Sequence, residues 1–215
     1  MKKFLKQAIP ALFLAACAAS ASAGVIALGS VDKDYGSAAG RGDTASTGGR
    51  SCDTLNATSI TVRDTSSGCT RFSDTFNFSS LVYKSIDSLE LSLTFSNTND
   101  YLDFGFIKFN EDWRVKIADT SSHSSKFTLD MNNSTAQTTQ LFHIDASTHP
   151  DVFANIVANR RFQLWFGDEA FGANNFMLSS ASLTVNGTPV PEPTGIALFA
   201  IAMLGAAAAR RRGAR

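Results

Sequence analysis

Two pairs of adjacent carboxylates are the residues whose types and spacing could do hydrolytic chemistry. The pairs are Glu111-Asp112 and Asp168-Glu169. Either could serve a glycosidase if the fold brought it to about 5 to 9 Å from a partner carboxyl across a cleft. Adjacent acids in turns are usually only solvated, and the sequence has no G-x-S-x-G elbow, no H-E-x-x-H and no phosphate loop. We therefore expect a protein that is not an enzyme. A glycoside hydrolase is the last of three candidate functions, after the two given at the end of this subsection.

Metal binding has few candidate ligands. None of the three histidines has a cysteine or carboxylate at a metal-motif spacing, so no zinc site is expected; they are His123, His143 and His149. Oxygen ligands for calcium stand near predicted strand ends at Asp100, Asp103 and Asp168. Because the D-x-D-x-D-G loop is lacking, we expect no cofactor and keep calcium open as an alternative.

Aromatic side chains could stack on sugar rings. The candidates are Tyr35, Tyr101, Trp113 and Trp165. Trp165 lies between Leu164 and Phe166 on an alternating strand, so it should face the opposite way, either exposed or under a loop. The competing interpretation, tryptophan as part of the core, stays open.

The cysteines indicate an oxidising compartment. If Cys17 leaves with an N-terminal signal, Cys52 and Cys69 remain, and such a pair most simply forms one disulfide. It would close a loop of roughly 18 residues and contribute on the order of 3 kcal/mol. A metal or redox pair is the alternative, which the lack of C-x-x-C spacing disfavours.

The C-terminal residues have the pattern of a sorting tail. Val190-Pro191-Glu192-Pro193 ends any arriving helix or strand. The uncharged segment 194–209 follows, long enough for roughly 24 Å of helix, and its lack of a polar face favours membrane insertion over a buried core helix. The basic stop 210–215, with Arg210-Arg211-Arg212, would keep the extreme C-terminus in the cytoplasm.

This tail resembles the PEP-CTERM class of exported bacterial proteins, which combine Pro-Glu-Pro, a small-residue helix with a late glycine (here Gly205) and an arginine cluster. The resemblance implies recognition by an exosortase, processing near Pro191 to Pro193, and delivery to the envelope surface or extracellular matrix. Residues 72–76, Phe-Ser-Asp-Thr-Phe, also resemble the FxDxF motif that names one PEP-CTERM family. Asp74 on that strand face should find a hydrogen-bond partner.

The N-terminus reads as a secretory signal spanning residues 1–23. Lysines precede an apolar stretch, and Ala21-Ser22-Ala23 forms an A-x-A site before Gly24, the pattern that signal peptidase cuts. A lipoprotein signal with an acylated Cys17 is the alternative. A C-terminal anchor in the inner membrane would make a lipid redundant.

Without these ends the chain is acidic. Between Gly24 and Val190 it has 12 basic and 18 acidic residues, a formal net charge of −6. An acidic body disfavours nucleic acid as a partner and is compatible with neutral glycans.

The body alternates like strands. Residues 24–50 are rich in Gly and Ser, which predicts a flexible leader. Period-two patterns then predict nine strands and one connector helix at 150–159; the strands are 58–64, 71–78, 89–95, 101–109, 113–118, 126–131, 138–144, 161–166 and 175–185.

The predicted fold is all-β, an antiparallel β-sandwich over residues 51–188 with jelly-roll topology, followed by the sorting tail 189–215. We expect a cell-surface or extracellular-matrix protein with a structural or adhesive role in an exopolysaccharide or biofilm matrix. A lectin resembling a carbohydrate-binding module is the alternative function.

Overall fold

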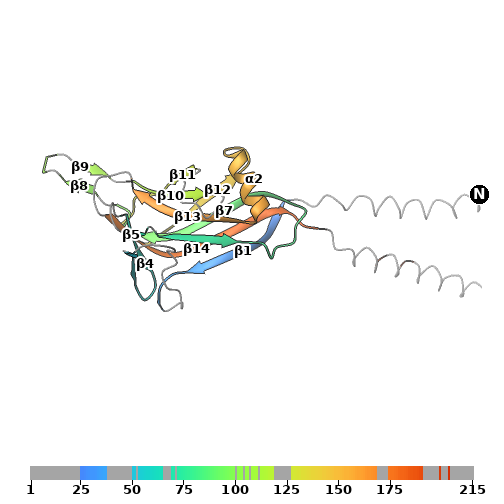
Figure 1. Ribbon diagram of the computed structural model, residues 1–215, viewed down its shortest axis with the longest axis horizontal. Coiled ribbons are helices and arrows are strands. Elements are labelled where there is room, and N and C mark those ends of the chain that lie inside the picture. Colours follow the sequence, from blue (N-terminus) through green and yellow to red (C-terminus); the bar gives the residue numbers. More distant parts are fainter. Residues whose placement is uncertain are drawn as a thin grey trace, which may run out of the picture.

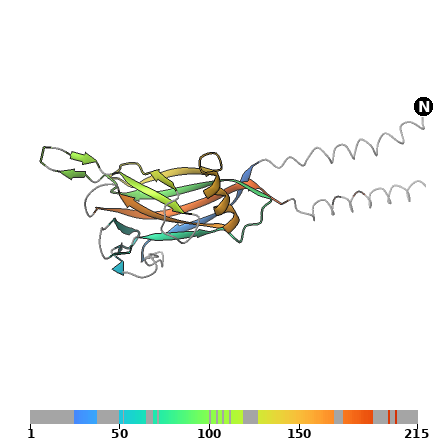
Figure 2. The same ribbon diagram turned by 45° about the horizontal axis from the view of Figure 1, so that its top comes forward.

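The computed structural model describes residues 25–37, 50–51, 53–64, 69–70, 72–99, 101–103, 105–106, 108–110, 112–118, 127–168 and 174–190, with positions 199 and 203. Two antiparallel sheets face each other in these residues (Figures 1 and 2). Alternating strands with one apolar side reach this arrangement because each sheet must bury that side against another layer. The predicted antiparallel sandwich is confirmed, and the jelly-roll topology stays a prediction.

The larger sheet has the order β12-β7-β14-β4-β3, and β1 also pairs with β14. β14 is its longest strand, with β7 along one side and with β4 and then β1 along the other. Its strands are β1 (Ile26–Asp34), β3 (Thr54–Leu55), β4 (Ile60–Asp64), β7 (Ser85–Ser96), β12 (Thr138–Asp145) and β14 (Asn174–Thr188).

The smaller sheet has the order β11-β10-β13-β6. Its strands are β6 (Ser73–Asn77), β10 (Trp113–Ala118), β11 (Phe127–Asp130) and β13 (Arg161–Asp168). Two short pairs complete the described strands: the parallel pair β2 (Arg50–Ser51) with β5 (Cys69–Thr70), and the antiparallel pair β8 (Tyr101–Asp103) with β9 (Lys108–Asn110).

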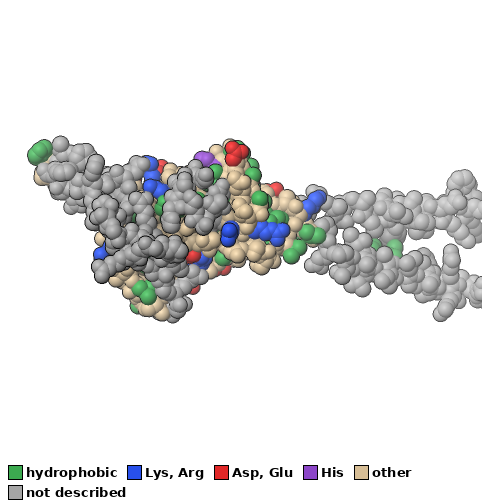
Figure 3. Space-filling view, in the orientation of Figure 1, with side chains coloured by type: hydrophobic (Ala, Val, Ile, Leu, Met, Phe, Trp, Pro, Cys, Tyr) green, Lys and Arg blue, Asp and Glu red, His purple; other side chains and the backbone are tan. Residues whose placement is uncertain are grey.

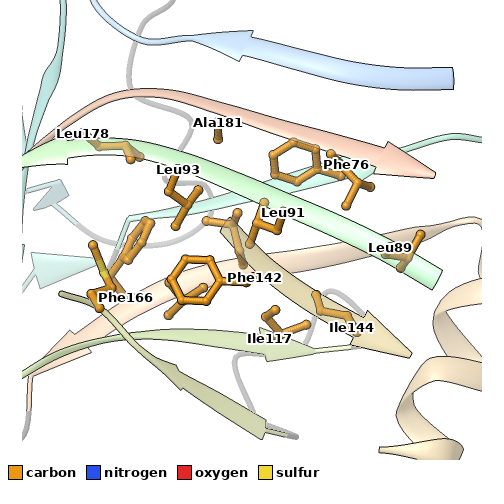
Figure 4. Packing of buried hydrophobic residues seen from close by; sticks show 14 of the residues in the cluster. Phe76, Leu89, Leu91, Leu93, Ile117, Phe142, Ile144, Phe166, Leu178 and Ala181 are labelled. Atoms are coloured by element: carbon orange, nitrogen blue, oxygen red, sulfur yellow. The ribbon is translucent and has the colours of Figure 1, made fainter. Parts of the chain in front are cut away.

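Large apolar side chains fill the space between the sheets. On β7, Leu89, Leu91, Leu93 and Phe95 are all fully buried, as their shared strand face predicted. They meet residues such as Phe142 and Ile117 of the other strands (Figure 4). Each buried side chain of this size stabilises the fold by about 1.5–3 kcal/mol, so the core holds the two sheets together.

The predicted connector helix is confirmed as α2 (Pro150–Asn159), with proline in its first turn. Phe153 and Ile156 point from it into the core. Arg160 ends the helix in the left-handed conformation, at φ 54°, and its N–H bonds the carbonyl of Val157. α2 lies at one end of the sandwich, and the β8–β9 pair projects from the other (Figure 1).

The prediction of a flexible leader is wrong for residues 26–34, which form β1. Val31 and Lys33 face the core across from Leu183 and Ala181 of β14, while alternate residues such as Asp32 face solvent. The composition of this segment predicted flexibility because it contains few apolar residues. The hydrogen bonds to β14 order the segment instead.

The predicted continuous strand 101–109 is also wrong. The chain forms the short pair β8–β9 instead, with Tyr101 opposite Asn110. Gly105 lies between the two strands at φ +83°, a left-handed conformation that favours a turn. Period-two alternation continued through this turn, and only the glycine indicated the break.

The two ends of the sandwich chain lie together. Ile26 at the start of β1 pairs with Gly187 near the end of β14, and β14 ends at Thr188, directly before Pro189. The segments that precede and follow the sandwich therefore leave it at the same end.

Candidate functional site

Asp74 is the least expected residue of the core. It lies on β6 opposite Leu164 of β13, and its two neighbours on the same strand face are Phe72 and Phe76, both buried. Its side chain is 7% exposed. A carboxylate in such apolar surroundings requires charged or hydrogen-bonding partners.

Lys33 and Tyr35 supply these partners from the N-terminal strand region. Lys33, whose side chain is 8% exposed, forms an ion pair and a hydrogen bond through Nζ with Asp74 Oδ1. The Tyr35 hydroxyl donates to Asp74 Oδ2 at 2.8 Å, and the backbone N–H of Thr75 donates to Oδ1 at 2.7 Å. The predicted hydrogen-bond partner of Asp74 is confirmed.

The register of β1 explains how a lysine reaches this place. Lys33 pairs with Ala181, whose small side chain leaves room for the lysine stem on the core side. Nζ also donates to the carbonyl of Thr75 at 2.7 Å and lies 4.8 Å from the centroid of the Phe76 ring. Tyr35 in turn packs edge-on against Phe72, with centroids 5.6 Å apart.

We call Lys33, Tyr35 and Asp74 the buried triad. It joins an edge strand of the larger sheet to an edge strand of the smaller sheet. Desolvation of two charges costs several kcal/mol unless partners satisfy both groups. Here Nζ and both carboxylate oxygens make hydrogen bonds. The Asp74 carboxylate thus contacts both an amine and a phenol under apolar cover.

Sequence reasoning found Asp74 but missed Lys33, and it singled out Tyr35 only as a glycan contact. The available signal was the alternation Val31, Lys33, Tyr35, which continues one strand face with a lysine in an apolar position. A lysine at an apolar position of such an alternation, together with an aspartate on the apolar face of a predicted strand, indicates a buried pair. Their 41-residue separation gave no local hint that they meet.

The outer face of the larger sheet is lined with hydroxyls. Ser182 and Ser30 donate hydrogen bonds to the exposed Asp32 carboxylate. These hydrogen bonds hold the pKa of Asp32 below its ordinary value, and the one from Ser182 has the larger effect. At the end of β12, side-chain and backbone hydrogen bonds from Ser147 lower the pKa of Asp145 in the same way. Hydrogen bonds to the charged form cause both shifts.

A hollow of about 420 Å³ opens on this side of the larger sheet. Asp34, Gln137 and Ser180 are among its lining residues. It lies where β14 bulges next to Ser180 and where Tyr35 N–H bonds the carbonyl of Ser179 at 2.9 Å. No second feature in this hollow indicates a ligand.

Three of the proposed glycan contacts, Tyr35, Trp113 and Trp165, are buried, so none of them is the exposed platform that this prediction needed. Trp113 is 0% exposed and packs on Phe176 in the core, with centroids 4.6 Å apart. Trp165 is 1% exposed. It does lie opposite to the core side, as predicted, with Lys116 of β10 and Ser73 of β6 as its lateral neighbours.

Tyr101 lies in β8, and its side chain is outside the described part of the chain.

On the face seen in Figure 3, the coloured Lys and Arg side chains lie in separate small groups, so no single-sign patch dominates the described surface there.

The candidate calcium site stays a prediction, because the side chains of all three ligands lie outside the described part of the chain. Asp103 ends β8, Asp168 ends β13 opposite Trp113, and Asp100 lies outside the described residues. Within the described ranges no three His, Cys, Asp or Glu residues stand close enough to hold a metal ion.

The histidines and the paired acids occupy ordinary positions where the structure describes them. His143 Nε2 contacts the Asp145 carboxylate at 3.2 Å, and His149 stacks on Phe127. Asp112 is exposed and accepts a hydrogen bond from Asn133 at 3.2 Å. His123, Glu111 and Glu169 lie outside the described residues, as does the side chain of Asp168.

The predicted disulfide stays a prediction, because Cys52 and the side chain of Cys69 are outside the described residues. The backbone does bring the two segments together: β2 pairs with β5, with Arg50 opposite Cys69 and Ser51 opposite Thr70.

Comparison with known families adds one decisive match. Residues 189–212 match the family described as the PEP-CTERM protein-sorting motif. The chain carries a PEP-CTERM sorting motif. The match contains the predicted Pro-Glu-Pro segment and Arg210 to Arg212. The PEP-CTERM motif implies export, sorting to the cell surface through the membrane, and processing by an exosortase.

Most of the PEP-CTERM motif lies outside the described residues, and so does the predicted signal with Ala21, Ala23 and Gly24. Val190, the last residue before Pro191, is described and is 45% exposed. Within the described part of the chain, no helix is long and apolar enough to span a membrane. The segment 194–209, apart from positions 199 and 203, falls outside that part.

No curated protein matches the sequence. Among solved structures, a xylan-binding module is similar at 14% identity and a TM-score of 0.39, covering 79% of this chain and all of the other. The coat protein of tobacco streak virus is similar at 10% identity and a TM-score of 0.27, covering 65% of this chain and 94% of the other. Likenesses at these values carry no argument about function.

Proposed function

We propose that this chain is a surface-sorted protein with a non-catalytic, structural or adhesive role in an extracellular polysaccharide matrix. The observation that carries the proposal is the PEP-CTERM motif at residues 189–212. The acidic body, at a formal net charge of −6 between Gly24 and Val190, suits an exported protein among neutral glycans.

The position of the motif in the fold supports this proposal. β14 runs to Thr188, so the motif begins as soon as the last strand ends. Val190, directly before Pro191, is exposed, and prolines disfavour a regular helix or strand. A membrane-embedded protease could therefore grip the segment while the folded sandwich remains intact.

The test is processing in a host that carries the exosortase. Pro191→Ala combined with Pro193→Ala should leave the tail attached and the protein in the membrane fraction, as measured by surface labelling and mass spectrometry of the C-terminus. Pro189→Ala, which alters a neighbouring proline outside the triplet, is the matched control and should be processed normally. Normal surface delivery of the double variant would contradict the sorting proposal.

Carbohydrate binding is the second candidate, because Trp165 stands on the outer side of the smaller sheet beside Lys116 and Ser73. Because Trp165 is buried, the residues that cover it would have to move before a sugar could stack on its ring. A glycan array with the processed protein separates the two roles. Binding that is lost in Trp165→Ala and kept in the control Lys84→Ala would favour a lectin.

A further inference from the structure

We propose that the side chains of Lys33 and Asp74 condense into an intramolecular amide cross-link. The two groups come from strands in different sheets and meet between Phe72 and Phe76. Lys33 Nζ contacts Oδ1, which is one bond away from the carbonyl carbon that an amine attacks. Both side chains are more than nine-tenths buried, at 8% and 7% exposure.

The proximity of the reacting groups supplies most of what this reaction needs. A folded protein that holds two reactants in contact replaces a bimolecular encounter, and effective molarities for such pairs reach about 10⁵ M or more. Lys33 Nζ already contacts Oδ1, so the proton that must leave the ammonium has an acceptor within reach. Because both side chains are buried, the water that would reverse the condensation has little access to them.

The bonds and protons balance without any other reactant. The Lys33 ammonium first transfers one proton to Oδ1, which leaves a neutral amine and a carboxylic acid. The Nζ lone pair then forms a bond to Cγ of Asp74, and the Cγ–Oδ1 bond breaks. A second proton from Nζ joins the departing Oδ1, which leaves as water, and the third proton remains on the amide nitrogen.

Tyr35 holds the group on which charge develops. Its hydroxyl donates to Oδ2 at 2.8 Å, the oxygen that becomes the amide carbonyl and carries negative charge in the tetrahedral intermediate. A donor fixed at that position lowers the barrier. The Thr75 carbonyl accepts a hydrogen bond from Nζ at 2.7 Å and so orients the amine.

The cross-link would join the two sheets at one edge of the sandwich. β1 pairs with β14 in the larger sheet, and β6 pairs with β13 in the smaller one. A covalent bond between them closes the chain from residue 33 to residue 74, so that β1 could not separate from the sandwich. Its formation depends only on folding and is independent of the proposed sorting.

Intact-mass spectrometry of the full chain, as it exists after any processing and with disulfides reduced, tests the proposal. We expect a mass lower than that of the sequence by one water molecule, and a proteolytic fragment in which Lys33 and Asp74 are joined. A folded wild-type protein at its full mass, with the near-ultraviolet circular dichroism of packed aromatic rings, overturns the proposal.

Variants identify the reacting atoms. Asp74→Asn should still form the amide but release ammonia, so its deficit corresponds to one ammonia molecule. Lys33→Met should show no deficit, whereas Lys116→Met, at a partly buried lysine on the outer side of the smaller sheet, should keep the loss of water. Tyr35→Phe should form the cross-link at least roughly tenfold more slowly. A water deficit that persists in Lys33→Met would place the cross-link elsewhere and overturn the assignment.

Discussion

Lys33 and Asp74 depend on each other, because each is a charged group that the fold removes from water. Removal of one partner leaves the other buried without its counter-charge, which typically costs 3–5 kcal/mol. The amide that we propose also requires both side chains.

We therefore expect Lys33→Met to lower the free energy of unfolding by about 3–5 kcal/mol. The double variant Lys33→Met with Asp74→Leu should lose less than this, since no unpaired charge remains in it. Urea unfolding of both single variants and the double variant gives the coupling. Additive losses would show that the two side chains do not interact.

Asp32 gives the surface a pH dependence. Its folded pKa lies below the ordinary value of 3.8 because Ser182 and Ser30 donate hydrogen bonds to the carboxylate. A lowered folded pKa means that the contribution to stability is present above pH 3.8 and is lost as the pH falls through the folded pKa. The loss thus belongs to the acid side of neutrality.

Ser182→Ala should make stability less sensitive to pH below about pH 4. The loss of this hydrogen bond reduces the difference between the folded and unfolded pKa values of Asp32, and that difference sets the pH dependence. The measurement is urea unfolding at a series of pH values, with Asp32→Asn as the control that removes the titration entirely. An acid-side slope that Ser182→Ala leaves unchanged would contradict the role of this hydrogen bond.

At the scale of elements, the turn after β1 depends on a close backbone approach. Gly36 has φ +115°, and a Cβ there would lie 2.6 Å from the carbonyl oxygen of Ala57 and 2.6 Å from the backbone nitrogen of Ser59. Neither atom can move without shifting the chain that leads into β4. Tyr35, the preceding residue, belongs to the buried triad, so the turn also positions its hydroxyl.

Gly36→Ala should therefore destabilise the protein by more than about 1–2 kcal/mol, the usual cost of a left-handed non-glycine residue. Gly105→Ala is the matched control: its φ is +83°, but nothing lies within 4 Å of the added Cβ, so only the conformational cost applies. Thermal unfolding of the two variants compares them. Equal losses of stability in the two variants would mean that the backbone at Ala57 and Ser59 can shift at little cost in free energy.

At the scale of the whole molecule, β1 is a part of the sandwich that lies just after the predicted signal cleavage. It covers one side of β14 and brings Lys33 to Asp74. Without β1, the second half of β14 would present unpaired backbone groups, which are prone to pair with other chains.

We expect a chain that begins at residue 38 to aggregate or to lose its cooperative unfolding transition. A chain that begins at Gly24 is the control and should remain monodisperse. Size-exclusion chromatography and circular dichroism check both. A stable, monomeric product from the shorter chain would contradict the structural role of β1.

Local patterns predicted much of this architecture. The alternation in β7 and β10 and the proline-led stripe of α2 identified these elements close to their observed bounds, because side-chain periods of 2 and 3.6 are properties of a few consecutive residues. The PEP-CTERM motif was equally predictable from the sequence, since the processing enzyme and the membrane recognise such a tail as a contiguous segment.

Contacts between distant residues required the tertiary structure. The leader composition of residues 26–34 hid a strand that exists only because β14 offers it hydrogen bonds, and nothing near Lys33 in the sequence indicated Asp74. Trp165 faced away from the core as predicted, yet its burial depends on neighbours from other parts of the chain. Periodicity states which side chains share a face, while strand order and register decide what that face meets.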